Sequence, residues 1–102
     1  MINPELLEEL QDNECLLADG LDEALIGITE GVNPVAVYET YKCIDILMEE
    51  GMSEEDAVEY FYYNIAGGYV GEKTPLFIKT VAGWHLKLCL RRSLIMRILM
   101  EI

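Results

Sequence analysis

The chain has 102 residues, 52% of them hydrophobic, and a formal net charge of −12 at pH 7. This length fits one domain with a real hydrophobic core, and the mixture of aliphatic, aromatic and charged residues argues against disorder. The charge is segregated: residues 1–78 hold 18 Asp and Glu against two Lys, a net of −16, whereas residues 79–102 carry +4. An acidic body of this kind excludes direct binding of nucleic acid or an anionic membrane, because phosphate contacts need Lys and Arg.

The first half of the body predicts one helix and a β-hairpin. An N-terminal helix should begin at Asn3-Pro4-Glu5, because Asn is a good N-cap and Pro suits the first helical turn. Strands are predicted near residues 24–29 and 35–38, joined as an antiparallel hairpin. The first strand is apolar on both faces, so we expect it inside the sheet, and Gly27 indicates a bulge or a close backbone approach.

The second half predicts a helical hairpin and a last strand. Helices are expected over residues 39–50 and 54–65, with Gly51 ending the first and Ser53 capping the second. The buried stripe of the second helix is expected to contain Val58, Phe61, Tyr62 and Ile65. A third strand near 76–79 would complete a small antiparallel sheet packed by the helices. The predicted fold class is therefore α+β.

Residues 79–102 change character, so we divide the chain into an acidic domain, 1–78, and a basic, apolar C-terminal extension, 79–102. Residues 85–91 alternate as a strand would, while 93–102 look helical by propensity. The segment separates poorly on a helical wheel, which argues against a membrane-surface helix. The sequence leaves open whether this segment is a native extension or a frameshifted tail.

Three cysteines, Cys15, Cys43 and Cys89, lie among apolar residues without a C-x-x-C pair. Their odd number and surroundings favour reduced, buried thiols in a reducing compartment. The N-terminus lacks the basic start and apolar run of a signal peptide, and no apolar stretch reaches the ~20 residues of a membrane span. A cytoplasmic location is expected by default.

No motif predicts catalysis, a cofactor or a metal. His85 and Cys89 are four residues apart, but no third group to orient such a pair is evident. The acidic turn that contains Asp19 and Asp22 lacks the alternating ligand spacing of a calcium loop. The cysteines and the single histidine lack the paired spacing of a zinc site. The sequence therefore predicts no enzyme, no cofactor and no metal.

The strongest candidate for function is a protein interface at the helical hairpin. Carboxylates concentrate where the two helices meet, and a run of aromatic residues must leave some Tyr side chains exposed, as interfaces favour. The alternatives are a solvated acidic face and tyrosines that cover the core. The candidate interface residues are Glu49, Glu50, Glu54, Glu55, Glu59, Tyr60 and Tyr63.

Five linked segments carry a resemblance to a known family: residues 17–28, 35–38, 42–48, 51–61 and 67–78. Over about residues 10–78 the chain resembles a family of short acidic proteins encoded by bacteriophages, prophages and some bacteria, generally labelled hypothetical. The resemblance implies no reaction, cofactor or site. Residues 79–102 lie outside its pattern.

Three functions remain open at this stage. The first is a small non-enzymatic accessory protein of phage or prophage type that binds a basic protein surface, in its sharpest form as a nucleic-acid mimic that inhibits a host DNA-binding or defence protein. The second is a structural homo-oligomer in which residues 79–102 of one subunit pack on the acidic body of another. The third is a small-ligand binder or enzyme whose site the sequence does not reveal.

Overall fold

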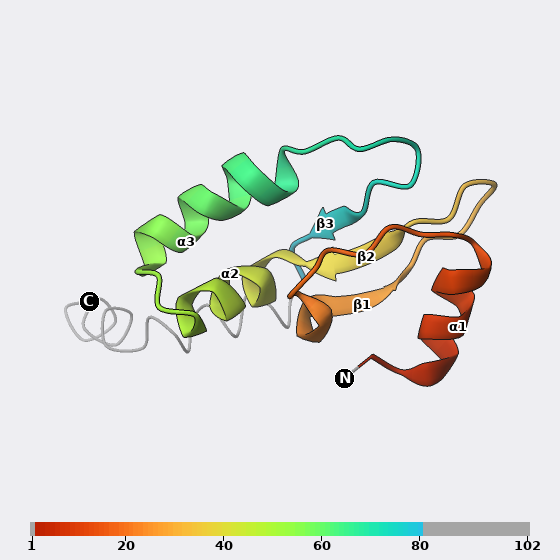
Figure 1. The fold of residues 1–102 in the computed structure, drawn as a ribbon, viewed down its shortest axis with the longest axis horizontal. Helices are drawn as coiled ribbons and strands as arrows, with labels where there is room; N and C mark the ends of the chain where they lie inside the picture. The colour runs from red at the N-terminus through yellow and green to blue at the C-terminus, as the bar shows by residue number, and fades with distance from the viewer. Residues whose placement is uncertain (1, 81–102) are drawn as a thin grey trace, which may run out of the picture.

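The computed structural model describes residues 2–80 (Figure 1). Its elements follow one another as helix α1 (Pro4–Asp12), 3₁₀ turn η1 (Asp22–Ala24), strands β1 (Leu25–Ile28) and β2 (Ala36–Glu39), helices α2 (Thr40–Glu49) and α3 (Glu54–Tyr60), π-helix η2 (Phe61–Ala66) and strand β3 (Leu76–Ile78). The α+β class, the N-terminal helix, the helical hairpin and the three strands are confirmed. The elements expected over 85–91 and 93–102 lie outside the described residues.

The helix ends use the capping residues that the sequence indicates. The Asn3 side chain accepts a hydrogen bond from the Glu5 amide at 2.8 Å, and the Ser53 hydroxyl accepts one from the Asp56 amide at 3.1 Å. Each bond satisfies an amide that the first turn leaves without a helical partner. Gly51 has a φ of +114°, which few other residues tolerate, and reverses the chain between α2 and α3. None of the helices described within residues 2–80 is long and apolar enough to cross a membrane.

The sheet is mixed, so the prediction of a wholly antiparallel sheet is wrong for its third strand. Strands lie in the order β1-β2-β3; β1 and β2 pair antiparallel, but β2 and β3 pair parallel, with Tyr38 opposite Phe77. Parallel strands need a long crossover, and here α2, α3 and η2 supply it. The helices run out and back, and the loop after η2 returns the chain to the starting end of β2 (Figure 1).

The position of β1 also differs from expectation. We expected it inside the sheet, but the central strand is β2, and β1 is an edge strand. The predicted irregularity at Gly27 is confirmed, since the register shifts between Leu25 and Gly27. Ile26 at this bulge is 48% exposed. β1 is therefore apolar on both faces although it has a neighbouring strand on one side only.

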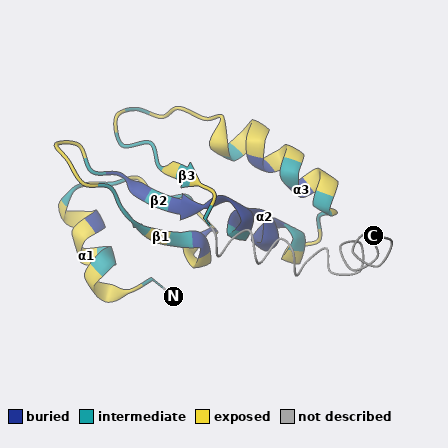
Figure 2. Ribbon diagram, turned by 180° about the vertical axis from the view of Figure 1, so that it is seen from behind, coloured by how far each residue is buried: buried dark blue, intermediate teal, exposed yellow. Residues whose placement is uncertain are grey.

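One face of the sheet carries the hydrophobic core. Tyr38, completely buried, stacks on Phe77 at 5.6 Å between ring centroids, and Phe77 meets the edge of Phe61 at 5.3 Å. Leu10 from α1 and Cys43 from α2 complete the set of large, fully buried side chains. Figure 2 shows this buried band running through β2 and α2, with exposed residues on the outer sides of α1 and α3.

The second helix of the hairpin is α-helical only as far as Tyr60. Phe61 is buried and Val58 and Ile65 are half-buried, as predicted, but Tyr62 is 45% exposed. The prediction assumed α-helical periodicity, whereas residues 61–66 form a π-helix with wider turns, which changes the direction of successive side chains. Tyr60 and Tyr63 are 43% and 79% exposed, which confirms that the aromatic run leaves some Tyr side chains at the surface.

Candidate functional site

A groove of about 570 Å³ lies between the helical hairpin and the two loops that face it. We call it the central groove. Its apolar wall comes from five different segments and includes Leu16, Leu17, Leu47, Ile65, Val70 and Phe77. Polar side chains stand around this wall, namely Asp19, Glu50, Tyr60, Asn64 and Thr74. An apolar wall with a few polar groups around it, in a groove of several hundred Å³, is typical of binding sites in proteins.

One wall of the groove, the loop over residues 16–21, is held from the core. The backbone amide of Ala18 donates a hydrogen bond to the Tyr38 hydroxyl at 2.8 Å. Burial raises the pKa of Tyr38, because the phenolate would lose its hydration, so the hydroxyl stays protonated. Leu16 and Leu17 are 43% and 41% exposed beside this anchor. Their apolar side chains are therefore presented to the groove by a fixed loop.

The opposite wall, residues 68–75, is held by its own side chains and by the β1–β2 hairpin. Thr74 accepts a hydrogen bond from the Val70 amide at 2.9 Å. Lys73 donates to the Pro34 carbonyl oxygen at 3.1 Å, and the Asn33 side chain donates to the Glu72 carbonyl oxygen at 2.6 Å. Both walls are thus fixed before any ligand arrives, which lowers the entropic cost of binding.

Two shallower hollows continue the groove. On one side, a hollow of about 360 Å³, the Glu49 hollow, shares Gly20 and Glu50 with the groove. On the other side, a hollow of about 420 Å³, the Tyr63 hollow, shares Tyr60 and Asn64 with it. The remaining lining residues are Asp22, Glu23, Ile46 and Glu49 in the first, and Asp56, Glu59 and Tyr63 in the second.

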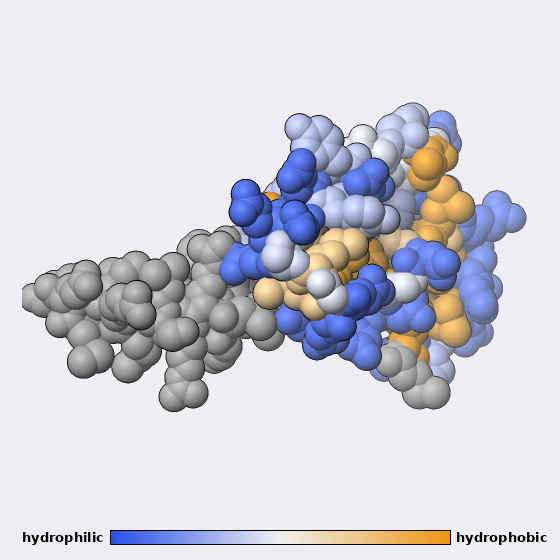
Figure 3. Space-filling model, turned by 60° about the vertical axis from the view of Figure 1, so that its left-hand side comes forward, coloured by the Kyte–Doolittle hydropathy of each residue, from blue (hydrophilic) through white to orange (hydrophobic). Residues whose placement is uncertain are grey.

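The three depressions form one continuous surface with an apolar centre and carboxylates at both ends. Figure 3 shows one face of the molecule, on which hydrophobic residues interrupt a largely hydrophilic surface in the middle and along the right-hand edge. A partner that fits this surface needs apolar side chains in its middle and positive charges on either side.

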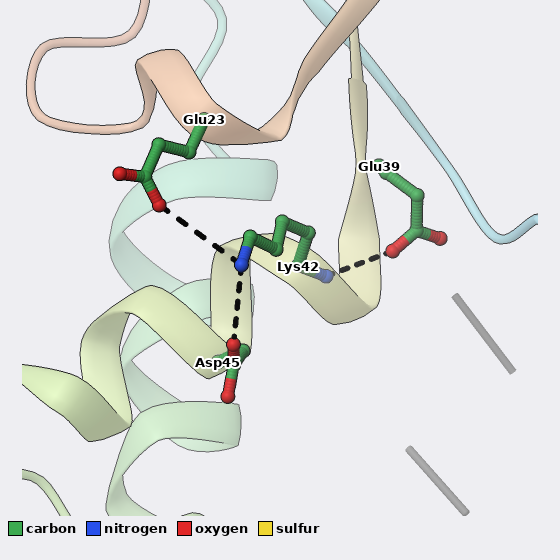
Figure 4. A network of polar contacts seen from close by, with 4 residues as sticks. All are labelled: Glu23, Glu39, Lys42 and Asp45. Atoms are coloured by element: carbon green, nitrogen blue, oxygen red, sulfur yellow. Dashed lines mark hydrogen bonds and ion pairs between the residues drawn. The ribbon is translucent and has the colours of Figure 1, made fainter. Parts of the chain in front are cut away.

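The carboxylates of the Glu49 hollow lie beside a small ion-pair network centred on Lys42 (Figure 4). The Lys42 ammonium lies 3.4 Å from an Asp45 oxygen and 4.0 Å from a Glu23 oxygen. Its backbone amide donates to the Glu39 carboxylate at 2.8 Å. Both ion pairs found among residues 2–80 use this lysine, and neither uses Asp19, Glu50 or Glu59.

The structure brings together most, but not all, of the residues proposed from the sequence. Five of the seven, namely Glu49, Glu50, Glu59, Tyr60 and Tyr63, line the groove or its hollows. Glu54 and Glu55 lie in the first turn of α3 and line none of the three. The sequence reasoning missed the apolar wall. The pair Leu16-Leu17, apolar residues outside any helix or strand, was the signal that could have indicated it.

The metal-ligating and thiol side chains of residues 2–80 are not gathered into a site. Across residues 2–80, no three His, Cys, Asp or Glu side chains lie where they could hold a metal ion together. Burial raises the pKa of Cys43 to about 12, so its thiol is not a nucleophile at neutral pH. Cys15 donates a hydrogen bond to the Pro34 carbonyl oxygen at 3.3 Å. His85 and Cys89 lie outside the described residues.

The arrangement therefore supplies surface for contact: apolar area, tyrosine edges and negative charge on a preformed frame. Comparison of the chain with protein-family models, with curated proteins and with solved structures finds no match.

Proposed function

We propose that the chain is a small, non-enzymatic accessory protein that binds a basic, apolar segment of a partner protein. The observation that carries the proposal is the continuous surface of the central groove and its two hollows, apolar in the middle and acidic at both ends. Lys or Arg side chains of the segment would meet Glu49 and Glu50 at one end and Glu59 at the other, while its apolar side chains enter the groove.

The balance of forces supports a protein partner. The apolar centre supplies affinity through buried area, and the carboxylates supply selection for basic partners and faster encounter. Tyr60 and Tyr63 provide rigid amphipathic edges of the kind enriched in protein interfaces. Nucleic acid and anionic membranes are disfavoured partners, because the body carries −16 and its few Lys are outnumbered.

The resemblance to short acidic phage and prophage proteins makes a cytoplasmic accessory protein of a phage or prophage the proposed context. The sharpest form of this proposal is a nucleic-acid mimic that occupies the basic site of a host DNA-binding or defence protein. A partner of that kind would be displaced from the chain by DNA. A partner that uses only an amphipathic segment would not.

A synthetic peptide with Leu and Phe in its middle and Lys at both ends provides the test. Its binding to the full chain would be followed by fluorescence anisotropy at low and moderate salt. We expect saturable binding that weakens with salt, since salt screens exposed charges that lie farther apart than a Debye length, about 10 Å at 0.1 M. The same peptide with Gln in place of Lys should bind at least tenfold more weakly.

Variants of the chain locate the binding surface. Tyr60→Ala and Glu50→Gln should weaken binding of the Lys peptide, the first by about tenfold, as expected for an aromatic interface residue. Glu8→Gln on the outer side of α1 removes the same charge far from the groove and serves as the matched control. Equal effects of Glu50→Gln and Glu8→Gln would show that net charge alone attracts the peptide and would refute the groove as the site.

A further inference from the structure

One carbonyl oxygen joins three segments that are far apart in the chain. The Pro34 carbonyl oxygen accepts a hydrogen bond from the Cys15 thiol at 3.3 Å and another from the Lys73 ammonium at 3.1 Å. Cys15 follows α1, Pro34 precedes β2, and Lys73 lies in the loop that leads to β3. Figure 1 shows these three segments close together at the right-hand end of the sheet. A thiol and an amine from distant segments therefore meet at this oxygen.

The two donor atoms are within reach of each other. Sγ of Cys15 and Nζ of Lys73 both contact the same oxygen, so at most about two hydrogen-bond lengths separate them. The ammonium group of a lysine stands on a flexible four-carbon stem. Nζ can therefore close the remaining gap by rotation within its own side chain while both backbones stay in place. The ion pairs found among residues 2–80 do not include Lys73, so no carboxylate there competes for it.

Of the two cysteines within residues 2–80, Cys15 is the one that an oxidant can reach. Cys15 is half-buried, whereas Cys43 is 0% exposed. Oxidation selects thiols that are accessible and that have a positive charge beside them. Cys15 has the Lys73 ammonium on the same acceptor oxygen. The thiol of Cys43 is out of reach and, because burial raises its pKa to about 12, is protonated at neutral pH.

We propose that hydrogen peroxide converts the Cys15–Lys73 pair into a covalent bridge with a bond between sulfur and nitrogen. In the first step the Cys15 sulfur attacks peroxide, the O–O bond breaks, and the thiol becomes a sulfenic acid with release of one water. In the second step the Lys73 ammonium gives one proton to the solvent, and the resulting amine attacks the sulfur. The hydroxyl group leaves as a second water with one amine proton. Sulfur loses two electrons, peroxide accepts them, and the product is a sulfenamide.

The bridge ties together the two walls of the central groove. Cys15 directly precedes the wall loop 16–21, and Lys73 lies within the opposite wall, residues 68–75. The bridge also closes a long loop of the chain, and such cross-links stabilise a fold mainly by restricting the unfolded chain. A thiol reductant cleaves the S–N bond, is itself oxidised to a disulfide, and returns both side chains to Pro34. The bridge is therefore reversible, as redox-sensing links in reducing compartments are.

Mass spectrometry of the full chain after treatment with hydrogen peroxide tests the proposal. The digestion uses a protease that cuts after Glu, because trypsin cannot cut at a bridged Lys73. We expect a linked pair of peptides, one with Cys15 and one with Lys73, that together weigh two hydrogen atoms less than the free peptides. Dithiothreitol should separate them. The bridge should also raise the urea midpoint of the chain, and dithiothreitol should reverse this rise.

Lys73→Arg is the matched control. Arginine keeps the positive charge and the hydrogen-bond donors but stays protonated, so it cannot attack the sulfenic acid. This variant should give no linked peptides, and dimedone should trap about threefold more sulfenic acid at Cys15 than in the unchanged chain. Cys15→Ser keeps a donor for Pro34 and should lose both signals. Equal dimedone trapping with Lys73 and with Lys73→Arg, an equal yield of bridges to another lysine, or a disulfide of Cys15 in place of the bridge would each overturn the proposal.

Discussion

At the scale of single residues, Tyr38 connects the core with the central groove. Its ring stacks on Phe77 from β3, and its hydroxyl holds the Ala18 amide of the groove wall at 2.8 Å. The side chain is completely buried, so water cannot replace either contact. A buried polar group that loses its partner costs more than an exposed one, because nothing else satisfies it.

Tyr38→Phe keeps the ring and removes the hydroxyl. We expect the free energy of unfolding to fall by about 1–3 kcal/mol, because the Ala18 amide loses its acceptor. Urea denaturation measures the change, and hydrogen exchange at Ala18 should accelerate with it. Tyr63→Phe, at a residue 79% exposed, is the control and should change stability by less than about 0.5 kcal/mol. Similar losses in both variants would contradict the role of the buried bond.

The raised pKa of Cys43 predicts that the free energy of unfolding falls at alkaline pH. Burial, with a smaller contribution from the nearby Glu39 charge, raises its pKa from 9.0 to about 12 in the folded chain. Above pH 9 the unfolded chain loses the thiol proton while the folded chain keeps it, which favours unfolding. Below pH 9 this thiol leaves the free energy of unfolding unchanged. Between pH 9 and pH 12 it lowers the free energy of unfolding by up to about 1.4 kcal/mol per pH unit.

Urea midpoints measured across this pH range check the prediction, with Cys43→Ala as the comparison. The variant should lose stability less steeply above pH 9, although Tyr38, whose pKa burial also raises, still contributes. Identical slopes in the two proteins would contradict the assignment to Cys43. Thiol reagents at neutral pH should likewise leave Cys43 unmodified in the folded chain, since its exposed fraction is 0%.

At the scale of elements, the π-helix η2 shapes the groove. It continues α3 with wider turns and directs Asn64 and Ile65 to the groove wall while Phe61 enters the core. Segments of π-helix occur often at functional sites. This element ends at Gly67, where the backbone leaves no room for a side chain: a Cβ atom there would lie 2.9 Å from the Tyr62 carbonyl oxygen.

Gly67→Ala should therefore disturb η2. The contact is with backbone, which cannot move aside cheaply, so we expect a loss of about 1–3 kcal/mol in the free energy of unfolding and weaker peptide binding. The neighbouring Gly68→Ala is the matched control, since its Cβ would lie 3.7 Å from the Ile65 carbonyl oxygen, an ordinary contact. Chemical denaturation of both variants gives the comparison. A harmless Gly67→Ala would argue against the π-helical ending.

The sequence predicted which elements form better than it predicted how they meet. Caps at Asn3 and Ser53 and the reversal at Gly51 depend on neighbours in the chain, so their local signals were sufficient. The parallel pairing of β3 and the edge position of β1 depend on where the chain returns after the helical hairpin. No local pattern encodes that return, and the periodicity that misplaced Tyr62 assumed the wrong helix type.

At the scale of the whole molecule, negative charge opposes compaction. The net charge of −12 implies self-repulsion that salt screens. We expect moderate sodium chloride to raise the thermal midpoint of the full chain at pH 7. Near pH 4.2, where the net charge approaches zero, the same salt should have much less effect. Calorimetry at both pH values provides the measurement, and an equal salt effect at both would refute self-repulsion as its cause.

Of the residues that line the candidate site, the sequence indicated only charged and aromatic ones. Glu49, Glu50, Glu59, Tyr60 and Tyr63 were recognised because they cluster in sequence around one helical hairpin. The apolar wall combines side chains from the loop 16–21, from α2 and from the loop 68–75, which are distant in the chain. Their convergence requires the crossover to β3 and the bond from Ala18 to Tyr38.

The sequence by itself determined the α+β class, the helix caps at Asn3 and Ser53, the reversal at Gly51, and the separation of an acidic body from a basic, apolar segment. These follow from capping, periodicity and charge, which act over a few residues or over the summed composition. Only the tertiary structure decided that β3 runs parallel to β2, that β1 is an edge strand, and that an apolar groove joins two acidic hollows. These features arise where distant segments pack, and packing depends on the whole path of the chain.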